Sequence, residues 1–262
     1  MELLYNNGII TMEEKLQIGI VNDEFNLFYQ PQYALANKEI VGLEALVRWM
    51  HPEEGLISPA DFIPVAEETG QIYELERLIV RRALKQKHQW EEDGIGHIEL
   101  AINLSGKTLA SERDFNEIET IISKNEVDYT TVTIEITETA MIENADQVVE
   151  RLNRLKSRGI KIALDDFGTG YSTLTYLGKF PIDVIKLDRS YVNLIPHDFV
   201  DTAIVRNMLK LAQDLNYKVI AEGIETGEQL EYLKEHSCEG GQGFLFSKPL
   251  PEDMIRDLIH NI

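Results

Sequence analysis

The sequence predicts an α/β fold built as an eight-stranded barrel, and three observations support that prediction. From Ser58 onward, short apolar runs alternate with segments of helical periodicity, as in a parallel sheet with crossover helices. The number of these strand and helix pairs is close to the eight that a closed barrel needs. The 262 residues are an ordinary length for one such barrel, and 44% hydrophobic residues are enough for a large core.

The expected elements follow one another in a regular order. Residues 1–23 are expected to be a lead-in or linker with a helix that begins after Thr11, and residues 24–262 to be the barrel domain. Two β-rich stretches, 25–33 and 39–49, flank a turn at 36–38 and predict an antiparallel pair. Further strands are expected over residues 98–104, 131–136, 160–164, 183–187, 218–221 and 241–245. Helices are expected over residues 59–69, 73–90, 115–123, 145–157, 172–177, 200–215, 228–236 and 251–260.

Composition and charge argue against several classes of function. The 45 acidic against 25 basic residues give a net charge of -20, which disfavours a nucleic-acid polymer or an anionic membrane surface as the main partner. Cys238 is the single cysteine, so no intrachain disulfide can form and a reducing compartment is expected. The chain opens without the basic start of a secretory signal, and no apolar run approaches the ~20 residues that span a bilayer. We therefore expect a cytoplasmic protein that does not insert into a membrane.

Charged and amide side chains recur at the ends of the expected strands. Asp165 and Asp166 end the apolar run 160–164, and two adjacent carboxylates at the edge of a hydrophobic core repel each other unless a cation lies between them. In a barrel, the carboxyl ends of parallel strands converge on the face that carries active sites. The residues expected at that face are Glu44, Asn103, Glu135, Glu138, Asp165, Asp166, Lys186, Glu222 and Glu225.

Taken together, these residues favour a bound cation. A single acid at a strand end usually caps a helix or pairs with a nearby Lys or Arg. Several carboxylates in one low-dielectric cavity would repel one another, so a stable fold gathers them only with cations to bind. Oxygen ligands from Asp, Glu and Asn suit Mg²⁺ or Mn²⁺, and no His or Cys pairs have the spacing of zinc ligands. Lys186 would reduce the repulsion or help to orient and deprotonate a water, and both roles can hold at once.

Eight short motifs, taken in order, give a specific resemblance. They are Gln30-Pro31, Glu44-Ala45-Leu46, Asn103-Leu104-Ser105, Glu135-Ile136-Thr137-Glu138, the segment 165–172 that begins Asp165-Asp166-Phe167-Gly168, Ile185-Lys186-Leu187-Asp188, Ala221-Glu222-Gly223-Ile224-Glu225 and Gln242-Gly243-Phe244. With these motifs the chain, from about Phe25 to its C-terminus, resembles the EAL-domain cyclic di-GMP phosphodiesterases. The resemblance implies a TIM-like (β/α)8 barrel whose first strand runs antiparallel. It also implies hydrolysis of cyclic di-GMP to the linear dinucleotide pGpG and a homodimer formed through the loop after Asp166, and it is compatible with an upstream sensory domain.

The resemblance assigns two Mg²⁺ or Mn²⁺ ions and a role to each site residue. One metal would be held by Glu44, Asn103, Glu135 and Asp165, and the second by Asp165, Asp166 and Glu222. Two metals ~3.5 to 4 Å apart would bind a phosphate oxygen, make a water more acidic and stabilise an in-line displacement. Lys186 and Glu222 would position and deprotonate that water, with the choice of base left open. Glu138 would anchor the loop 166–174, Glu225 and Gln242 would support the catalytic residues, and Gln30, Arg48 and Gln242 would contact the substrate.

Two other functions share some of these features. A receptor of the same family that binds cyclic di-GMP without cleaving it would be expected to have lost metal ligands or part of the loop. Here Asp165, Asp166 and Glu138 are all present. A metal-assisted enolising barrel with Lys186 as its base would also place acids and a lysine at strand ends. The loop 167–170 and the ordered motifs favour the phosphodiesterase.

Overall fold

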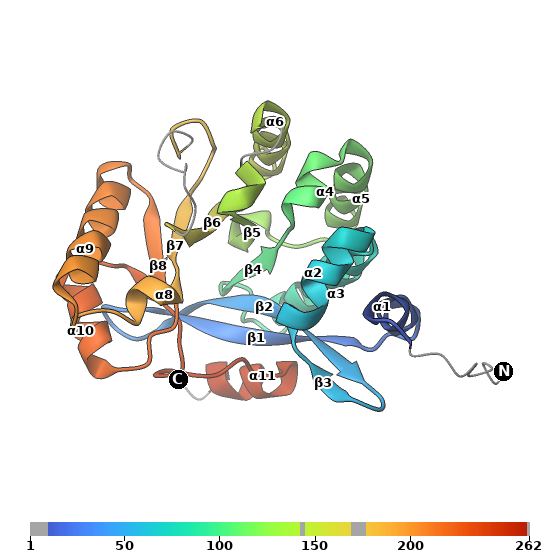
Figure 1. Cartoon of the computed structure of the whole chain (residues 1–262), viewed down its shortest axis with the longest axis horizontal. Helices are drawn as coiled ribbons and strands as arrows, with labels where there is room; N and C mark the ends of the chain where they lie inside the picture. The colour runs from blue at the N-terminus through green and yellow to red at the C-terminus, as the bar shows by residue number, and fades with distance from the viewer. Residues whose placement is uncertain (1–9, 142–144, 169–176, 261–262) are drawn as a thin grey trace.

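The computed structural model describes residues 10–141, 145–168 and 177–260, and these residues form a closed barrel surrounded by helices (Figure 1). Eight of the described strands pair in the cyclic order β1-β9-β8-β7-β6-β5-β4-β2, and the β1–β2 pairing closes the ring. β1 is antiparallel to both β2 and β9, whereas the other neighbours around the ring are parallel. The expected fold class, with its antiparallel first strand, is therefore confirmed.

The strands follow the expected apolar runs with two differences. β3 was not expected, and it pairs with the end of β2 as a short extension outside the ring. β9 is shorter than the expected 241–245, because the chain turns at Gly243, whose carbonyl accepts the NH groups of Phe246 and Ser247. The strands are β1 (Phe25–Ala34), β2 (Ile40–His51), β3 (Gly55–Ile57), β4 (Glu99–Asn103), β5 (Val132–Thr137), β6 (Lys161–Phe167), β7 (Val184–Leu187), β8 (Lys218–Ala221) and β9 (Gly240–Gly241).

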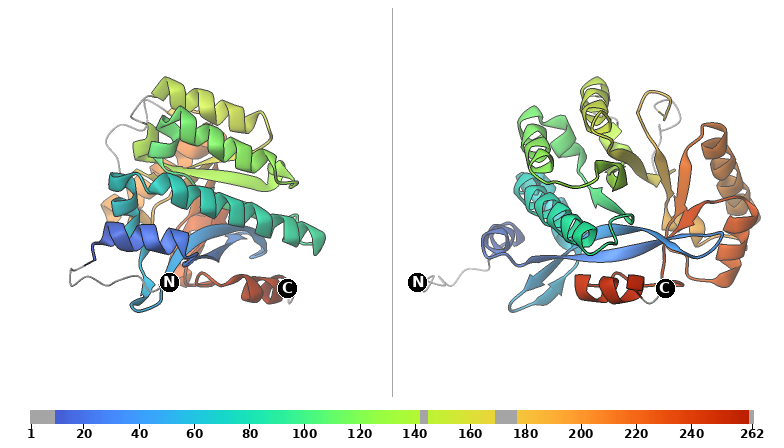
Figure 2. Two further views of the ribbon diagram at one scale, coloured as in Figure 1. Left: turned by 90° about the vertical axis from the view of Figure 1, so that its right-hand side faces the viewer. Right: turned by 180° about the vertical axis from the view of Figure 1, so that it is seen from behind.

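The helices lie on the outside of the ring, as the ribbon views show (Figures 1 and 2). α2 begins and ends as expected because Ser58 caps its first turn and Gly70 takes a left-handed φ of 77° after its last residue. The expected helix 172–177 lies outside the described residues except for Leu177. The helices are α1 (Met12–Val21), α2 (Pro59–Thr69), α3 (Ile72–Glu92), α4 (Gly106–Ala110), α5 (Glu112–Ser123), α6 (Ala145–Lys156), α8 (Arg189–Val192), α9 (Phe199–Asp214), α10 (Gly227–Glu235) and α11 (Glu252–His260), with short 3-10 turns η1 (Tyr129–Thr131) and η2 (Glu138–Met141).

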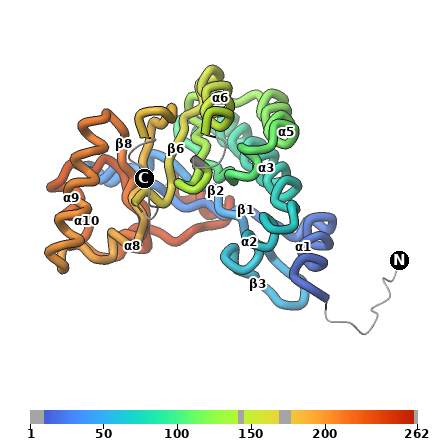
Figure 3. The backbone as a smooth tube through the Cα atoms, turned by 45° about the horizontal axis from the view of Figure 1, so that its top comes forward, coloured from blue at the N-terminus to red at the C-terminus, as the bar shows by residue number. Residues whose placement is uncertain are grey.

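The N-terminal helix α1 packs against the domain. It lies beside α2, at the end of the molecule opposite α9 and α10 (Figure 3). Leu16 of α1 is fully buried in the main hydrophobic core, and Thr11 forms a capping box with Glu14. The division at residues 23 and 24 stays a prediction. In the described parts of the chain, no helix combines the length and the apolar character needed to cross a membrane.

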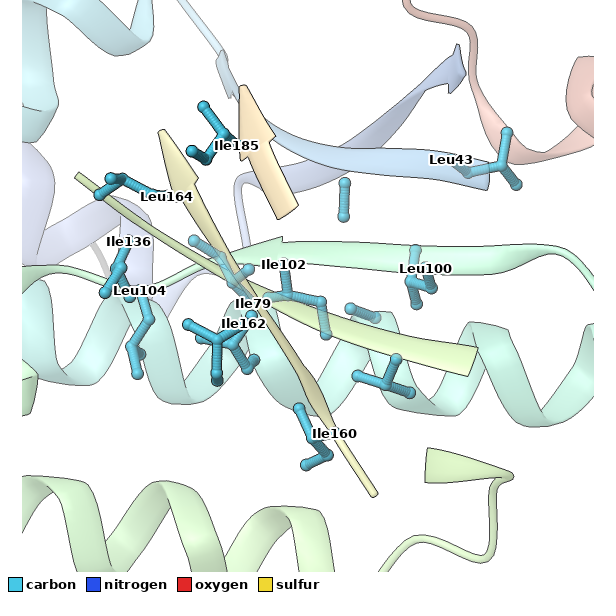
Figure 4. Packing of buried hydrophobic residues seen from close by; sticks show 14 of the residues in the cluster. Leu43, Ile79, Leu100, Ile102, Leu104, Ile136, Ile160, Ile162, Leu164 and Ile185 are labelled. Atoms are coloured by element: carbon cyan, nitrogen blue, oxygen red, sulfur yellow. The ribbon is translucent and has the colours of Figure 1, made fainter. Parts of the chain in front are cut away.

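The core has two parts because side chains alternate between the two faces of each strand. Outward-facing residues such as Ile102 and Ile162 pack against the surrounding helices, and Figure 4 shows them beside Ile79 of α3. Inside the barrel, a separate small apolar cluster consists of Ala163, Val184 and Ile220. The inward-facing positions nearer the carboxyl ends of the strands are polar, and they form the candidate site.

Candidate active site

A layer of charged and amide side chains lies at the carboxyl ends of the strands, above the small apolar cluster. Asp165 follows Ala163 on β6 by two residues, and Lys186 follows Val184 on β7 by the same step. A two-residue step along a strand returns a side chain to the same face, so these residues point into the barrel. The charged layer consists of Glu44 from β2, Asn103 from β4, Glu135 from β5, Asp165 from β6, Lys186 from β7, Glu222 directly after β8 and Gln242 directly after β9.

Lys186 is the centre of the charged layer. Its ammonium nitrogen lies 2.7 Å from a carboxylate oxygen of Glu135 and 2.7 Å from one of Glu222. It also lies 3.2 Å from Glu44 and 3.3 Å from Asp165. The Lys186 side chain is only 1% exposed, so these charge interactions are poorly screened by water. Four carboxylates therefore share one ammonium group.

The pKa values of the layer reflect this imbalance of charge. Burial alone would lower the pKa of Lys186, but the carboxylates of Glu135 and Glu222 outweigh burial and raise that pKa well above its ordinary value. Burial and the adjacent Glu44 raise the pKa of Glu135, and burial raises the pKa of Glu222 to about 8. Burial acts on Glu44 too, but the Lys186 charge and a hydrogen bond from Gln242 lower its pKa overall. The raised pKa values of Glu135 and Glu222 show that burial disfavours their ionised forms, and a further bound cation would stabilise those forms.

Three of the carboxylates have the spacing of a metal site. One oxygen each from Glu44, Glu135 and Asp165 lies within 4.8 Å of the other two. Asn103 is at the edge of this group, and its side-chain amide donates to Glu44 at 3.0 Å. Such an amide can also present its oxygen, because a flip of the side chain exchanges its two ends. The donors fit the preference of Mg²⁺ and Mn²⁺ for oxygen ligands.

Asp166 lies beside this group on an irregular stretch of β6. The pairing of β6 with β7 shifts its register between Leu164 and Phe167, and Asp166 has a left-handed φ of 56°. Its NH donates to Asp165 Oδ1 at 2.9 Å. Burial, together with the charges of Asp165 and Asp188, raises the pKa of Asp166. The irregularity brings two consecutive carboxylates to one mouth of the barrel, whereas a regular strand would point them to opposite faces.

Gln242 holds two members of the layer in place. Its Nε2 donates to Glu44 at 2.6 Å and to Glu222 at 3.0 Å. Its Oε1 accepts a hydrogen bond from Gln32 at 3.1 Å. Support of the catalytic residues, the first of the two roles expected for Gln242, fits this position. Gln32 was not expected, although a two-residue step along β1 from Gln30 would have indicated it.

The two other expected substrate contacts lie at the same mouth. Gln30 is the register partner of Glu44 in the β1–β2 pairing, and its side chain donates to the Ser247 carbonyl at 2.6 Å. The Arg48 guanidinium lies 5.9 Å from the centre of the Phe28 ring. Arg48 also lines a cavity of 250 Å³ that reaches the charged layer. Arg48 therefore borders a space that Asn103 and Glu135 also line, whereas Gln30 is placed beside Glu44 by the strand register alone.

The last two expected site residues, Glu138 and Glu225, lie in different surroundings. Glu138 is buried, and its Oε2 accepts the backbone NH of Gly168 at 3.3 Å, immediately after Asp165-Asp166-Phe167. This contact is of the anchoring kind that was expected, although residues 169–174 of the loop lie outside the described residues. Glu225 is exposed in the loop before α10, where its backbone NH donates to Gln229 at 2.8 Å. The structure therefore does not bring Glu225 into the buried layer.

Glu76 on α3 is a buried acid that sequence reasoning missed. Its carboxylate accepts the Ser105 NH at 2.5 Å and the Thr108 hydroxyl, and so holds the loop that follows Asn103. Burial raises the pKa of Glu76 to about 7. Helical spacing is the signal that could have found it, because Glu76 falls within an apolar stripe. That stripe consists of Ile72, Leu75, Ile79, Val80 and Ala83.

The sequence of this chain is similar to those of known proteins. The EAL domain family matches residues 13–249 of the chain. The chain is 40% identical over 250 residues to the cyclic di-GMP phosphodiesterase NbdA of Pseudomonas aeruginosa, covering 95% of this chain and 32% of that protein. It is 38% identical over 240 residues to the cyclic di-GMP phosphodiesterase PdeR of Escherichia coli, covering 92% of this chain and 36% of that protein.

A solved structure agrees with these relatives. The PaMucR phosphodiesterase in complex with c-di-GMP superimposes with a TM-score of 0.88 at 34% identity, covering 93% of this chain and 99% of that one. The chain spans about a third of the length of the two curated relatives. Their shared sequence, and the barrel with its antiparallel first strand, lead to one assignment. This chain belongs to the EAL-domain family of cyclic di-GMP phosphodiesterases.

Proposed function

We propose that this chain hydrolyses cyclic di-GMP to the linear dinucleotide pGpG in a metal-dependent reaction. The observation that carries the proposal is the charged layer, in which four carboxylates share one ammonium at the mouth of the barrel. Carboxylates gathered in this way favour binding of further cations. The names of the relatives NbdA and PdeR, and the ligand bound to PaMucR, support cyclic di-GMP as the substrate.

In this proposal the acids hold two Mg²⁺ or Mn²⁺ ions. Glu44, Asn103, Glu135 and Asp165 would hold one ion, and Asp165, Asp166 and Glu222 would hold the other. When bound, the ions would supply Lewis-acid stabilisation of the phosphate charge and a more acidic water. Gln242 would keep Glu44 and Glu222 oriented through its two hydrogen bonds.

Lys186 and Glu222 have different roles in this proposal: one balances charge and the other accepts a proton. The four carboxylate contacts of Lys186 favour its ammonium form, so it would balance charge and donate hydrogen bonds. Glu222 is 17% exposed against 1% for Lys186, so Glu222 is the member of this pair that can reach water. We therefore assign proton acceptance to Glu222.

Substrate contacts would come from the rim of the site. Arg48 would meet a phosphate, because a guanidinium binds phosphate oxygens through paired donors. Gln30 would contact the nucleotide beside it. We also propose that the chain forms a homodimer through the loop after Asp166, most of which lies outside the described residues, and that it works with an upstream sensory domain. Light scattering on the purified chain would test for the homodimer.

One assay tests the reaction. The purified chain is incubated with cyclic di-GMP and Mn²⁺, with and without a chelator, and the nucleotides are separated by chromatography. We expect pGpG to accumulate with the metal and to be absent with the chelator. Tight binding beside unchanged substrate would contradict hydrolysis and indicate a receptor. Conversion of enolisable carboxylates instead would indicate the enolising class of barrel.

A further inference from the structure

Gly168 follows the paired aspartates and Phe167, and hydrogen bonds hold both its NH and its carbonyl. Its NH donates to Glu138, and its carbonyl accepts the Tyr191 hydroxyl at 2.5 Å. Its φ of 98° is a left-handed value that favours glycine. A side chain at this position would also collide with Met208 and with the Tyr191 ring, which lies 3.0 Å from the site of an added Cβ. A residue with a side chain would therefore be strained at this position.

This position matters because the backbone just before it is unfavourable. Asp166 has a positive φ of 56°, which is uncommon for residues other than glycine, although Asp adopts it more readily than most. Phe167 then rejoins the sheet opposite Leu187 and is 3% exposed. The contacts of Phe167 and Gly168 together fix the chain on the far side of the irregularity. Loss of a hydrogen bond that holds Gly168 would let the Asp166 backbone relax toward an ordinary conformation.

We propose that Tyr191 is a positioning residue for the metal site, acting through the hydrogen bond from its hydroxyl to the Gly168 carbonyl. The inference rests on the proposed metal-dependent function. Tyr191 lies on α8, five residues after Lys186, and Asp188 caps that helix by accepting the Ser190 NH at 3.0 Å. The short segment that supplies the central ammonium thus also holds the backbone that presents Asp165 and Asp166. In this role Tyr191 acts through the Gly168 carbonyl.

The test removes only the hydroxyl group. In Tyr191→Phe the ring is retained, so its packing against Gly168 is kept while the hydrogen bond is lost. Titration of the metal-free protein with Mn²⁺ by calorimetry, without substrate, should show about three- to tenfold weaker binding, the effect of one ordinary hydrogen bond. With cyclic di-GMP, kcat should fall while KM changes little, because the role proposed for Tyr191 is to position metal ligands and not to bind the substrate.

Tyr129→Phe is the matched control. The Tyr129 hydroxyl also donates to backbone carbonyls, those of Ile122 at 2.8 Å and Asn125 at 2.9 Å. This variant should lower the melting temperature about as much as Tyr191→Phe does and leave Mn²⁺ affinity unchanged. Equal Mn²⁺ affinity in wild type and Tyr191→Phe would overturn the positioning role alone. A wild-type chain that neither binds Mn²⁺ nor cleaves cyclic di-GMP would overturn the proposed function and, with it, the role of Tyr191.

Discussion

Asp165 is the residue on which the proposed chemistry depends most. It belongs to the three-carboxylate group and also contacts Lys186 at 3.3 Å. Asp165→Asn should abolish turnover, because it removes the charge of a ligand proposed to serve both ions. The chain should stay folded, since the change also reduces repulsion among buried acids.

The control for Asp165→Asn is the same substitution at the surface. Asp214→Asn removes an exposed carboxylate that pairs with Lys210 at 2.7 Å on α9. Exposed pairs of this kind contribute little to stability, so both turnover and melting temperature should be close to wild type. Near-normal hydrolysis by Asp165→Asn in chelator-treated buffer would contradict the metal assignment.

Glu76 makes a prediction about stability and pH. Burial raises its pKa from an ordinary 4.5 to about 7, so the folded state binds the proton more tightly than the unfolded state does. Stability therefore falls as the pH rises from about 4.5 to 7, by on the order of 3 kcal/mol from this one group. Glu76→Gln should remove that fall and be the more stable protein above pH 7. Urea unfolding at pH 5 and pH 8 measures the difference, and equal pH dependence in the two proteins would contradict the prediction.

At the scale of elements, Glu138 links η2 to the end of β6. It is buried, and its carboxylate accepts the Gly168 NH at 3.3 Å. Glu138→Ala should loosen Gly168 and lower kcat by about 10- to 100-fold, the usual effect of losing a group that supports metal ligands. The melting temperature should change little. Glu138→Gln retains an oxygen that can accept the same NH, so it should recover part of the activity, whereas a large fall in melting temperature would indicate a purely structural residue.

The elements also explain which parts of the site were predictable. Apolar runs followed by polar residues indicate strand ends, so Glu44, Glu135 and Asp165 could be placed at one mouth from sequence alone. The same pattern placed Lys186 beside these acids as a group that reduces their repulsion, but it did not show that four carboxylates share this one ammonium. Lys186 becomes the shared cation only when the strands close into a ring.

The pattern of apolar and polar residues also could not predict long-range hydrogen bonds, irregular backbone or very short elements. The hydrogen bond between Gln32 and Gln242 joins residues 210 positions apart, and no local pattern encodes it. The left-handed backbone at Asp166 depends on the contacts that hold Gly168 in the folded chain. Short elements such as β3 and α8 contain too few residues to show a period.

At the scale of the whole molecule, ring closure converts separate strand ends into one charged layer. Each carboxylate comes from a different strand, and β1 and β2 complete the ring around them. The net charge of -20 adds to the negative potential around this layer. The proposed anionic substrate would approach because Arg48 and the proposed cations set the local field.

Because the charged layer forms only when the barrel is folded, a cation that binds there should stabilise the whole fold against unfolding. Mn²⁺ that binds only the folded chain should add about 2.7 kcal/mol of stability at 100 times its dissociation constant, which corresponds to a rise of about 5–10 °C in melting temperature. Screening of the surface charge by salt would also stabilise so acidic a chain, and NaCl at equal ionic strength measures that contribution. The specific part should saturate with Mn²⁺, reverse with a chelator and disappear in Asp165→Asn. A rise that persists in Asp165→Asn, or that NaCl reproduces, would mean that the ions act on the acidic surface and not at the charged layer.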